Sequence, residues 1–559
     1  MSAITDRLPV ETIHGIITFL DSPSDVLSFG LSSKTLAEIS IPHHHIYRVF
    51  RVKLSESAPI SRFFAQADLA AGEVRELDIL PENIADVCHG DYGPDRWMAE
   101  PLIPPKELAL QSKSTIDYKS YDQVREVELL LIEAVKQMKR LKRFGWYQCP
   151  PPLVVGQGDL WHTLGNLGSL DELDIADEPL SRFSSSQPRF LDIKLLARTE
   201  TFLNLRGLKA LTISTHTYDR VEDNVDITGI FGMFAGNKDL EKLKLLLKSP
   251  VTTSITPLLA AARWDHMRIL HLSGRIHCTP SPLLRFLYAH PLIEELTLAP
   301  LIVGKRWLHK PKTPPTRPLL PHLRRLNCKV YQVIWLVEHG AGSGIIELTG
   351  ISLARTLIMN GIFSVNYPDE VDEDDEGDLQ MDQSGEDRPS PFRGPFLDIL
   401  RTARLPVLTK LGVRGRADDF ADIVPLIPHV RELALDFVLE SNLDDFLPHL
   451  ASLPKLTVLH APALFYSDRY HLYKYPNYNF EENAPCVCKL ARACPLLRRI
   501  TFENSQYVVV RDGDVLKWVY RKLGDDEPTV CFGSRLSLII VHESRGVKGM
   551  DDAENCLAD

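Results

Sequence analysis

Residues 293–298 read Ile-Glu-Glu-Leu-Thr-Leu, with apolar side chains at positions one, four and six. Positions four and six share one face of a β-strand, whereas a helix would place them on different faces. The motif therefore predicts a short strand wherever it occurs. Its instances begin at Val74, Leu170, Leu208, Leu240, Met267, Ile293, Leu323, Leu408, Val430, Leu456 and Leu497.

Proline precedes many of these predicted strands at a fixed distance. With 39 prolines in 559 residues, the eleven positions two residues before the motif should hold fewer than one proline by chance. Proline ends a helix and favours extended backbone in its neighbour, so each unit is expected to be helix, break, strand. Six of these positions are proline and two are glycine: Pro291, Pro321, Pro406, Pro428, Pro454, Pro495, Gly72 and Gly168.

The central instances follow one another at intervals of 38, 32, 27, 26 and 30 residues. Strand-plus-helix units of this size resemble leucine-rich repeats, which stack into a solenoid. The expected fold class is therefore α/β: a degenerate leucine-rich-repeat-like solenoid with a curved parallel sheet. A conventional α/β domain with a chance similarity to the repeats is the alternative.

The first forty residues have a helical pattern of their own. Residues 13–20 carry an apolar stripe at helical spacing. Ser22 and Pro23 are typical of a second helix start, and a third helix is expected from about Ser33 until Pro42 stops it. Three such short helices bury little surface alone, so this unit is expected to need a partner.

Residues 8–34 contain, in order, Leu-Pro-x-Glu, Ile-x-x-Phe-Leu, Asp-Val-Leu and Leu-Ser-Ser-Lys, which resembles the F-box. In that family the helices dock on the Skp adaptor of cullin–RING ubiquitin ligases. The resemblance therefore implies a Skp-type adaptor as partner and, through it, a cullin–RING ligase. A helical hairpin packing only on its own domain is the alternative. The residues that match the motif, and so are implied to bind the adaptor, are Leu8, Pro9, Ile13, Ile16, Phe19, Leu20, Leu27, Leu31 and Lys34.

These patterns divide the chain into an F-box at 1–42, a connecting region at 43–135, a repeat array at 136–503 and a C-terminal cap and tail at 504–559. We expect a disordered acidic insertion in the array at 366–395. Residues 366–387 hold eleven Asp or Glu and no Lys or Arg, which equals the whole net charge of −11. The remainder is neutral and its expected concave face alternates in sign, so no nucleic-acid partner is expected.

No apolar run is long enough for a membrane span, and charged residues interrupt the N-terminus where a secretory signal would need an apolar core. Nine cysteines scattered over the chain are typical of reduced thiols. We therefore expect a cytoplasmic or nuclear protein without a membrane partner.

Sequence motifs for chemistry are few. The triplet His43-His44-His45 is expected to face solvent, and Cys486, Cys488 and Cys494 lack the spacing of a structural zinc site. The chain is therefore expected to be no enzyme and to carry no metal or cofactor. The expected function is a non-catalytic substrate receptor that bridges a target protein to an SCF-type ubiquitin ligase. The alternative is a leucine-rich-repeat scaffold that binds proteins without recruiting a ligase.

Overall fold

The structure, a computed structural model, forms two compact units, Met1–Arg306 and Trp307–Asp559. It describes residues 8–80 except 21 and 67, 121–177 except 148, 150 and 151, 193–216, and 227–298 except 249–252 and 275. In the second unit it describes residues 317–353, 392–461 except 416 and 438–442, 480–502, 505–512 and 515–522.

The first unit contains a parallel sheet whose strands follow their order in the chain. Its strands are β1 (Val49–Lys53), β2 (Glu76–Leu80), β3 (Arg143–Tyr147), β4 (Glu172–Asp177), β5 (Ala210–His216), β6 (Lys242–Lys248), β8 (Ile269–Gly274) and β10 (Glu295–Thr297). A separate pair is formed by β7 (Thr253–Ser254) and β9 (Ile276–His277).

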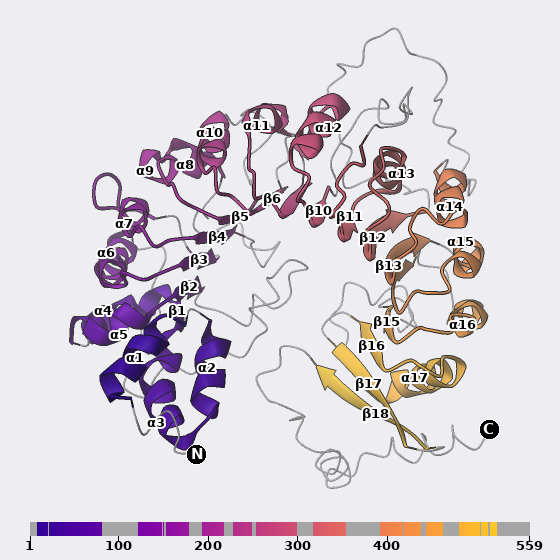
Figure 1. The fold of residues 1–559 in the computed structure, drawn as a ribbon, viewed down its shortest axis with the longest axis horizontal. Helices are drawn as coiled ribbons and strands as arrows, with labels where there is room; N and C mark the ends of the chain where they lie inside the picture. Colours follow the sequence, from indigo (N-terminus) through magenta and orange to yellow (C-terminus); the bar gives the residue numbers. More distant parts are fainter. Residues whose placement is uncertain are drawn as a thin grey trace. The chain divides into compact units, whose positions relative to one another are not determined.

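Helices of the first unit form an N-terminal group and a layer along one side of the sheet (Figure 1). The N-terminal helices are α1 (Val10–Thr18), α2 (Pro23–Leu31) and α3 (Lys34–His43). The layer comprises α4 (Ser57–Gln66), α5 (Asp68–Glu73), α6 (Tyr121–Gln137), α7 (Leu160–Asn166), α8 (Ile193–Arg198), α9 (Glu200–Leu203), α10 (Thr228–Gly236), α11 (Thr256–Ala261) and α12 (Pro280–Ala289). Short 3-10 turns lie at His45–Tyr47 and Leu54–Glu56.

The second unit repeats this arrangement and ends in an antiparallel hairpin. Its parallel strands are β11 (Arg325–Asn327), β12 (Glu347–Ser352), β13 (Lys410–Gly415), β14 (Glu432–Phe437), β15 (Val458–His460) and β16 (Arg499–Phe502), and the hairpin is β17 (Ser505–Asp512) with β18 (Val515–Lys522). Its helices are α13 (Val330–Glu338), α14 (Arg393–Arg401), α15 (Ala417–Ile423), α16 (Leu443–Ala451) and α17 (Phe480–Ala493), with a 3-10 turn at Val424–Leu426.

The register of the sheet confirms the strand motif. Where two motif strands are neighbours within a unit, position four of one pairs with position four of the other, as in Leu411 with Leu433 and Leu433 with Leu459. Leu433 is fully buried and Leu435 is 3% exposed, while the intervening Ala434 is only half-buried. Alternate residues of each strand therefore form the core between sheet and helices, which confirms the α/β solenoid with curved parallel sheets in the two units.

Apart from the β7–β9 pair, three of the described parallel strands lie outside the eleven motifs. β1 has the aromatic residues Tyr47 and Phe50 at positions one and four, and β3 uses Phe144 and Trp146 as its core residues. In β12 a register shift between Leu348 and Ile351 disrupts the spacing. Gly350 adopts φ +78° at that shift, a conformation that disfavours side chains. β1 and β2 lie within the range expected to connect the F-box to the array, and both belong to its sheet.

Two local expectations need correction. α3 does not stop before Pro42 but runs to His43, because proline removes only its own N–H and His44 still donates to the carbonyl of Ser40 at 3.1 Å. The range assigned to the acidic insertion, 366–395, ends inside α14, which begins at Arg393. The acidic residues 366–387 lie outside the described residues.

Replacing Leu433 with alanine is expected to cost about 2–5 kcal/mol of local stability, because the change leaves a cavity under the sheet. Ala434→Ser, one residue along the same strand, should be nearly neutral. Hydrogen exchange of the β13–β15 amides measures both effects, and damage should spread first to neighbouring repeats. Equal tolerance at the two positions would contradict the solenoid register.

Candidate functional site

The three N-terminal helices have a small core of their own. Ile13 and Ile17 of α1, Val26 of α2 and Leu36 of α3 are buried together. Ser22 and Ser33 cap α2 and α3 by accepting hydrogen bonds at 3.2 Å from the backbone N–H groups of residues 24 and 36. Leu8, Leu20, Phe29 and Ile39 pack against this core while remaining partly exposed.

The residues implied to bind the adaptor fall into two groups. Ile13 is 2% exposed, so it supports the unit from within. Leu8 and Leu20 pack against the core, and Leu27 is half-buried. The exposed group consists of Pro9, Ile16, Phe19, Leu31 and Lys34.

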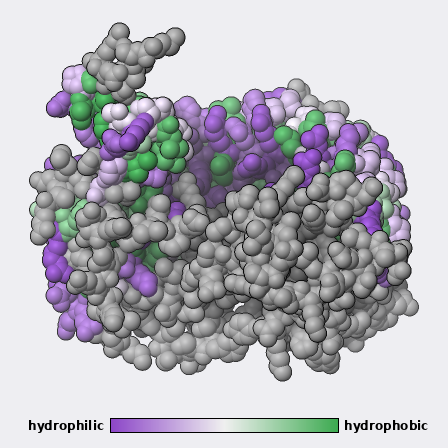
Figure 2. All heavy atoms as spheres, turned by 90° about the horizontal axis from the view of Figure 1, so that it is seen from below, coloured by the Kyte–Doolittle hydropathy of each residue, from purple (hydrophilic) through white to green (hydrophobic). Residues whose placement is uncertain are grey.

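The exposed group includes large apolar side chains. Phe19, at the end of α1, is 86% exposed, and Leu31, at the end of α2, is 69% exposed. Val10, which the motif did not single out, is 50% exposed and Ile16 is 38% exposed. Figure 2 shows hydrophobic surface gathered on the N-terminal helices, at its upper left. Apolar side chains presented together in this way are typical of a protein-docking surface.

A buried polar network joins these helices to the first strands of the sheet. His44 is 4% exposed, so the expectation that the histidine triplet faces solvent is wrong for its central member. His44 makes hydrogen bonds to His14 at 2.7 Å and to the Glu73 carboxylate at 3.0 Å. Arg48, fully buried, donates to the carbonyl of Ile17 at 2.7 Å. The network fixes α1 against the start of the array.

Neighbouring hydrogen-bond donors and positive charges keep the Glu73 carboxylate of this network ionised. Burial by itself raises the pKa of Glu73, but the hydrogen bond with His44 and the positive charges of Arg48, His44 and Arg75 outweigh it and lower the pKa below its usual value. A lowered pKa in the folded state stabilises the fold at neutral pH, and this contribution is lost as the pH falls through that value.

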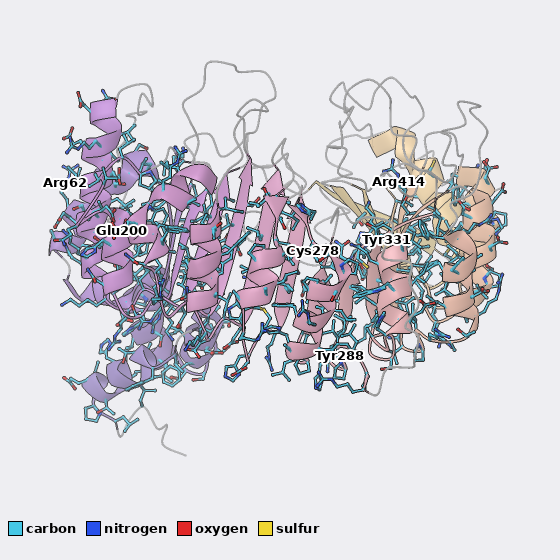
Figure 3. All side chains as sticks on the ribbon, turned by 90° about the horizontal axis from the view of Figure 1, so that it is seen from above. Arg62, Glu200, Cys278, Tyr288, Tyr331 and Arg414 are labelled. Atoms are coloured by element: carbon cyan, nitrogen blue, oxygen red, sulfur yellow. The ribbon has the colours of Figure 1, made fainter. Side chains whose placement is uncertain are left out.

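The second candidate surface is the concave side of the sheets. It is lined by the strand side chains at motif positions three and five. Figure 3 labels Arg414 on strand β13 of the second unit, and Arg62, Glu200 and Tyr288 on helices α4, α9 and α12, which belong to the helical layer of the first unit. The expected alternation of charge is present on the strands. In the second unit, Lys410 lies 3.0 Å from Glu347 and 2.9 Å from Glu432, and His460 lies 2.8 Å from Glu432.

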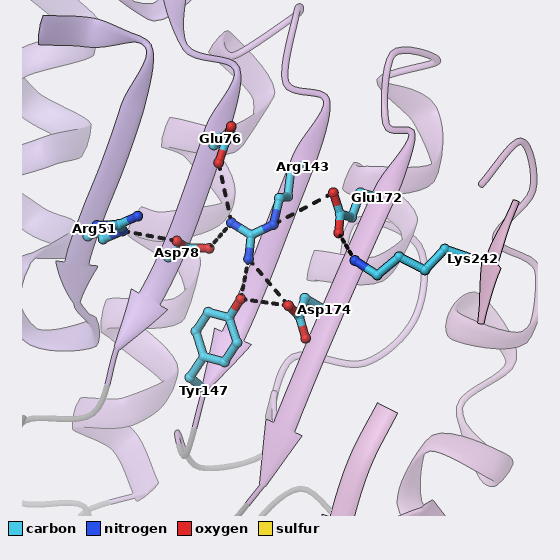
Figure 4. Close-up of polar contacts among 8 residues, drawn as sticks. All are labelled: Arg51, Glu76, Asp78, Arg143, Tyr147, Glu172, Asp174 and Lys242. Atoms are coloured by element: carbon cyan, nitrogen blue, oxygen red, sulfur yellow. Dashed lines mark hydrogen bonds and ion pairs between the residues drawn. The ribbon is translucent and has the colours of Figure 1, made fainter. Parts of the chain in front are cut away.

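In the first unit the alternation centres on Arg143 of β3 (Figure 4). Its guanidinium donates to Asp78 of β2 at 2.7 Å and to Asp174 of β4 at 3.3 Å. Tyr147 accepts a hydrogen bond from Arg143 and donates one to Asp174 at 3.0 Å. Glu76 and Glu172 lie 3.5 and 3.9 Å from the same guanidinium. One cation therefore bridges carboxylates from the two flanking strands.

Gly145 makes this arrangement possible. A Cβ atom at Gly145 would lie 2.4 Å from Asp78 Oδ1 and 2.4 Å from the Tyr147 ring. Asp78 is 2% exposed and Asp174 is 8% exposed. Burial raises the pKa of both carboxyl groups, and the charge of Arg143 only partly offsets that rise.

Sequence reasoning missed Arg143 and Tyr147 because residues 141–146, Leu-Lys-Arg-Phe-Gly-Trp, were not recognised as an instance of the motif. The one-four-six spacing is present there, with Phe144 and Trp146 in place of aliphatic residues. An allowance for aromatic residues would have found the strand.

Glu128 of α6 is a further buried acid. It is 1% exposed, and one of its oxygens accepts hydrogen bonds from the backbone N–H groups of Leu153 at 2.6 Å and Val154 at 3.1 Å. Burial raises its pKa to about 7 despite these two bonds. The carboxyl therefore titrates near neutral pH and ties the loop before α7 to the helix.

This titration predicts a pH-dependent stability. A pKa raised in the folded state means that unfolding becomes easier as the pH rises from the ordinary glutamate value towards the folded one. The free energy of unfolding should fall by about 2 kcal/mol from this group between pH 5.5 and 8. Glu128→Gln, which keeps an acceptor oxygen, should remove that decrease in chemical denaturation experiments. The exposed Glu126→Gln should keep it, and a decrease that persists in the Glu128 variant would contradict the assignment.

Within the described residues, no group of three or more His, Cys, Asp or Glu side chains is placed to hold a metal ion. Cys494 is buried and directly follows α17, and Cys486 is half-buried within that helix. No helix in the described part of the chain is long and apolar enough to cross a membrane.

Comparisons with known proteins assign no family to this chain. No family model matches the chain, and no curated protein matches it. Among solved structures, it is similar to a crystal structure of the Rad7 and Elc1 complex in yeast, with a TM-score of 0.34 and 14% sequence identity, over 71% of this chain and 72% of that chain. The repeat fold described above therefore rests on the strand order and register of this chain itself.

Proposed function

We propose that this protein is a non-catalytic substrate receptor. Its N-terminal helices dock on a Skp-type adaptor and through it on a cullin–RING ubiquitin ligase, while the repeat array holds a target protein. The observation that carries the proposal is the exposure of Phe19 and Leu31 on a unit that matches the F-box order of residues. Large apolar side chains left in water favour association, because their burial is favourable.

The joint between the helices and the sheet supports the same function. Arg48 and the His14–His44–Glu73 chain hold α1 against the first strands, so a docked adaptor has a fixed orientation relative to the first unit. A receptor of this kind contributes proximity, since it converts the encounter of target and ligase into an effectively intramolecular event. The proposal assigns no bond-making step to this chain.

The paired charges on the strands indicate how the concave side would select a target protein. In both units the strand carboxylates lie beside Arg, Lys or His side chains, as in Arg143 with Asp78 and Lys410 with Glu432. Ion pairs of this kind reduce the net field of the surface. A target that uses the concave side is therefore selected by shape and directed hydrogen bonds more than by net charge.

The experiment compares the full chain with a variant carrying Phe19→Ser and Leu31→Ser. Point changes are preferable to deletion of the helices, because deletion removes the carbonyl that Arg48 binds. Both forms are purified from cells with their associated proteins, and the proteome is quantified. Proteins that associate with both forms, but accumulate only when the variant replaces the intact chain, are targets. Associated proteins whose abundance is identical in both cells would favour the scaffold without ligase recruitment.

A further inference from the structure

The residues that immediately precede the parallel strands of the second unit form a continuous row along the N-terminal edge of its sheet. Each one after the first, Arg324, donates its backbone N–H to the carbonyl of the preceding member. For example, Ile346 donates to Arg324 at 2.8 Å and Arg431 donates to Thr409 at 2.7 Å. The row consists of Arg324, Ile346, Thr409, Arg431, Thr457 and Arg498.

This row carries cations without neutralising acids. Arg324, Arg431 and Arg498 are all exposed. Among the described residues no carboxylate lies within 4.0 Å of any of the three guanidinium groups. The turns just before β14 and β15 add His429 and Lys455, also exposed, to the same edge.

In the equivalent row of the first unit, acidic and basic residues neutralise one another. From β3 onward its members alternate in sign, and neighbours pair: Lys209 lies 3.0 Å from Asp171, and Arg268 lies 3.4 Å from Glu294. That row consists of Lys142, Asp171, Lys209, Glu241, Arg268 and Glu294. The repeat geometry is the same in the two units, so the absence of acids from the second row is a property of its sequence.

Apolar side chains lie among the cations of the second unit. Ile346 is 39% exposed and belongs to the row itself. Val407 and Leu496, in the turns that precede β13 and β16, are 45% and 50% exposed. Arginines interspersed with aliphatic side chains fit a protein partner better than a bare phosphate backbone, which offers aliphatic groups no contact.

We propose that this edge of the second unit binds an acidic polypeptide segment of a partner protein, one that carries apolar side chains between its acids. Neighbouring strands are about 4.8 Å apart, which places Arg324 about 14 Å from Arg431 and Arg431 about 10 Å from Arg498. An extended segment advances about 3.4 Å per residue. Its carboxylates therefore meet the arginines when they are spaced three to four residues apart. The proposed surface contains no residue of the N-terminal helices, so its test does not require the adaptor.

The test uses the full chain and a fluorescent twelve-residue peptide with glutamate at every third or fourth position and leucine between. Fluorescence anisotropy measures its dissociation constant at several salt concentrations. A variant carrying Arg324→Gln, Arg431→Gln and Arg498→Gln should bind at least tenfold more weakly and show a smaller salt dependence. The matched control, Lys209→Gln with Arg268→Gln in the paired row, should bind like the intact chain. Replacing the peptide leucines with serine should also weaken binding.

Four results would overturn the proposal. In the first, the peptide does not bind the full chain; in the second, the triple variant binds it as tightly as the intact chain does. In the third, a twelve-nucleotide single strand binds more tightly than the peptide. The last is binding of the peptide only after residues 366–387 are deleted, which would make the chain's own acidic segment the occupant. Because all three arginines are exposed, circular dichroism of the triple variant should match that of the intact chain.

Discussion

Replacing Phe19 and Leu31 with serine is expected to weaken adaptor binding by about a hundredfold or more. Burial of one such side chain contributes about 1.5–3 kcal/mol, and each 1.4 kcal/mol changes the dissociation constant about tenfold. The two side chains are 86% and 69% exposed in the free chain, so their loss should leave the fold intact. Titration calorimetry with the purified adaptor measures the change.

Two controls separate docking from folding. Leu129→Ser and Val155→Ser remove apolar side chains that are 46% and 80% exposed elsewhere in the first unit, and adaptor affinity should not change. Ile13→Ala, inside the three-helix core, should lower the stability of the helices together with binding. Full adaptor affinity in the Phe19 and Leu31 variant, or an equal loss of affinity in the Leu129 and Val155 variant, would contradict adaptor docking on these side chains.

Arg143→Met is expected to cost about 3–5 kcal/mol of stability at pH 7, because it leaves the buried Asp78 and Asp174 without their shared cation. The pKa of each carboxyl is already raised by burial, and loss of the guanidinium raises it further. Acids with raised pKa in the folded state are least destabilising when protonated. The stability lost in the Arg143→Met variant should therefore become smaller as the pH is lowered from 8 to 5.

Hydrogen exchange of the β3 and β4 amides, followed at several pH values, measures this effect locally. Lys242→Met is the matched control. Lys242 pairs with Glu172 at 2.7 Å, but both side chains are about a quarter exposed, so its loss should cost under about 1 kcal/mol. A loss of stability in the Arg143 variant that is equal at pH 5 and pH 8 would contradict the role of the two carboxylates.

The repeat fold could be predicted where the sequence keeps one simple pattern. At Leu433 and Leu435 the spacing by two, with proline two residues before the motif, predicts both the strand and its buried face. At β12 the bulge at Gly350 places Ile351 where the pattern expects position six, so the spacing is broken although the core is the same. Local irregularities of this kind move a side chain by one residue and conceal the repeat.

The candidate sites could be predicted only in part. The F-box order identified the helices, but it did not distinguish Ile13, which is 2% exposed and forms the core, from Ile16, which is 38% exposed, because both belong to one apolar stripe. The ring of acids around Arg143 depends on pairing between strands 65 and 31 residues apart in the chain, and no local pattern encodes that register. His44 was expected in solvent for the same reason, since its partner Glu73 is distant in sequence.

The proposed function requires that the N-terminal helices connect the repeat array to a ligase core. The most direct measurement is the mass of the particle formed when the purified full chain, the adaptor and the cullin are mixed at equal concentration. We expect the full chain to form one particle that contains one copy of each protein. For the variant with Phe19→Ser and Leu31→Ser we expect two separate species, the free chain and the adaptor–cullin pair. A full chain that stays at its own mass beside the adaptor–cullin pair, or that binds the adaptor while excluding the cullin, would contradict the proposed function.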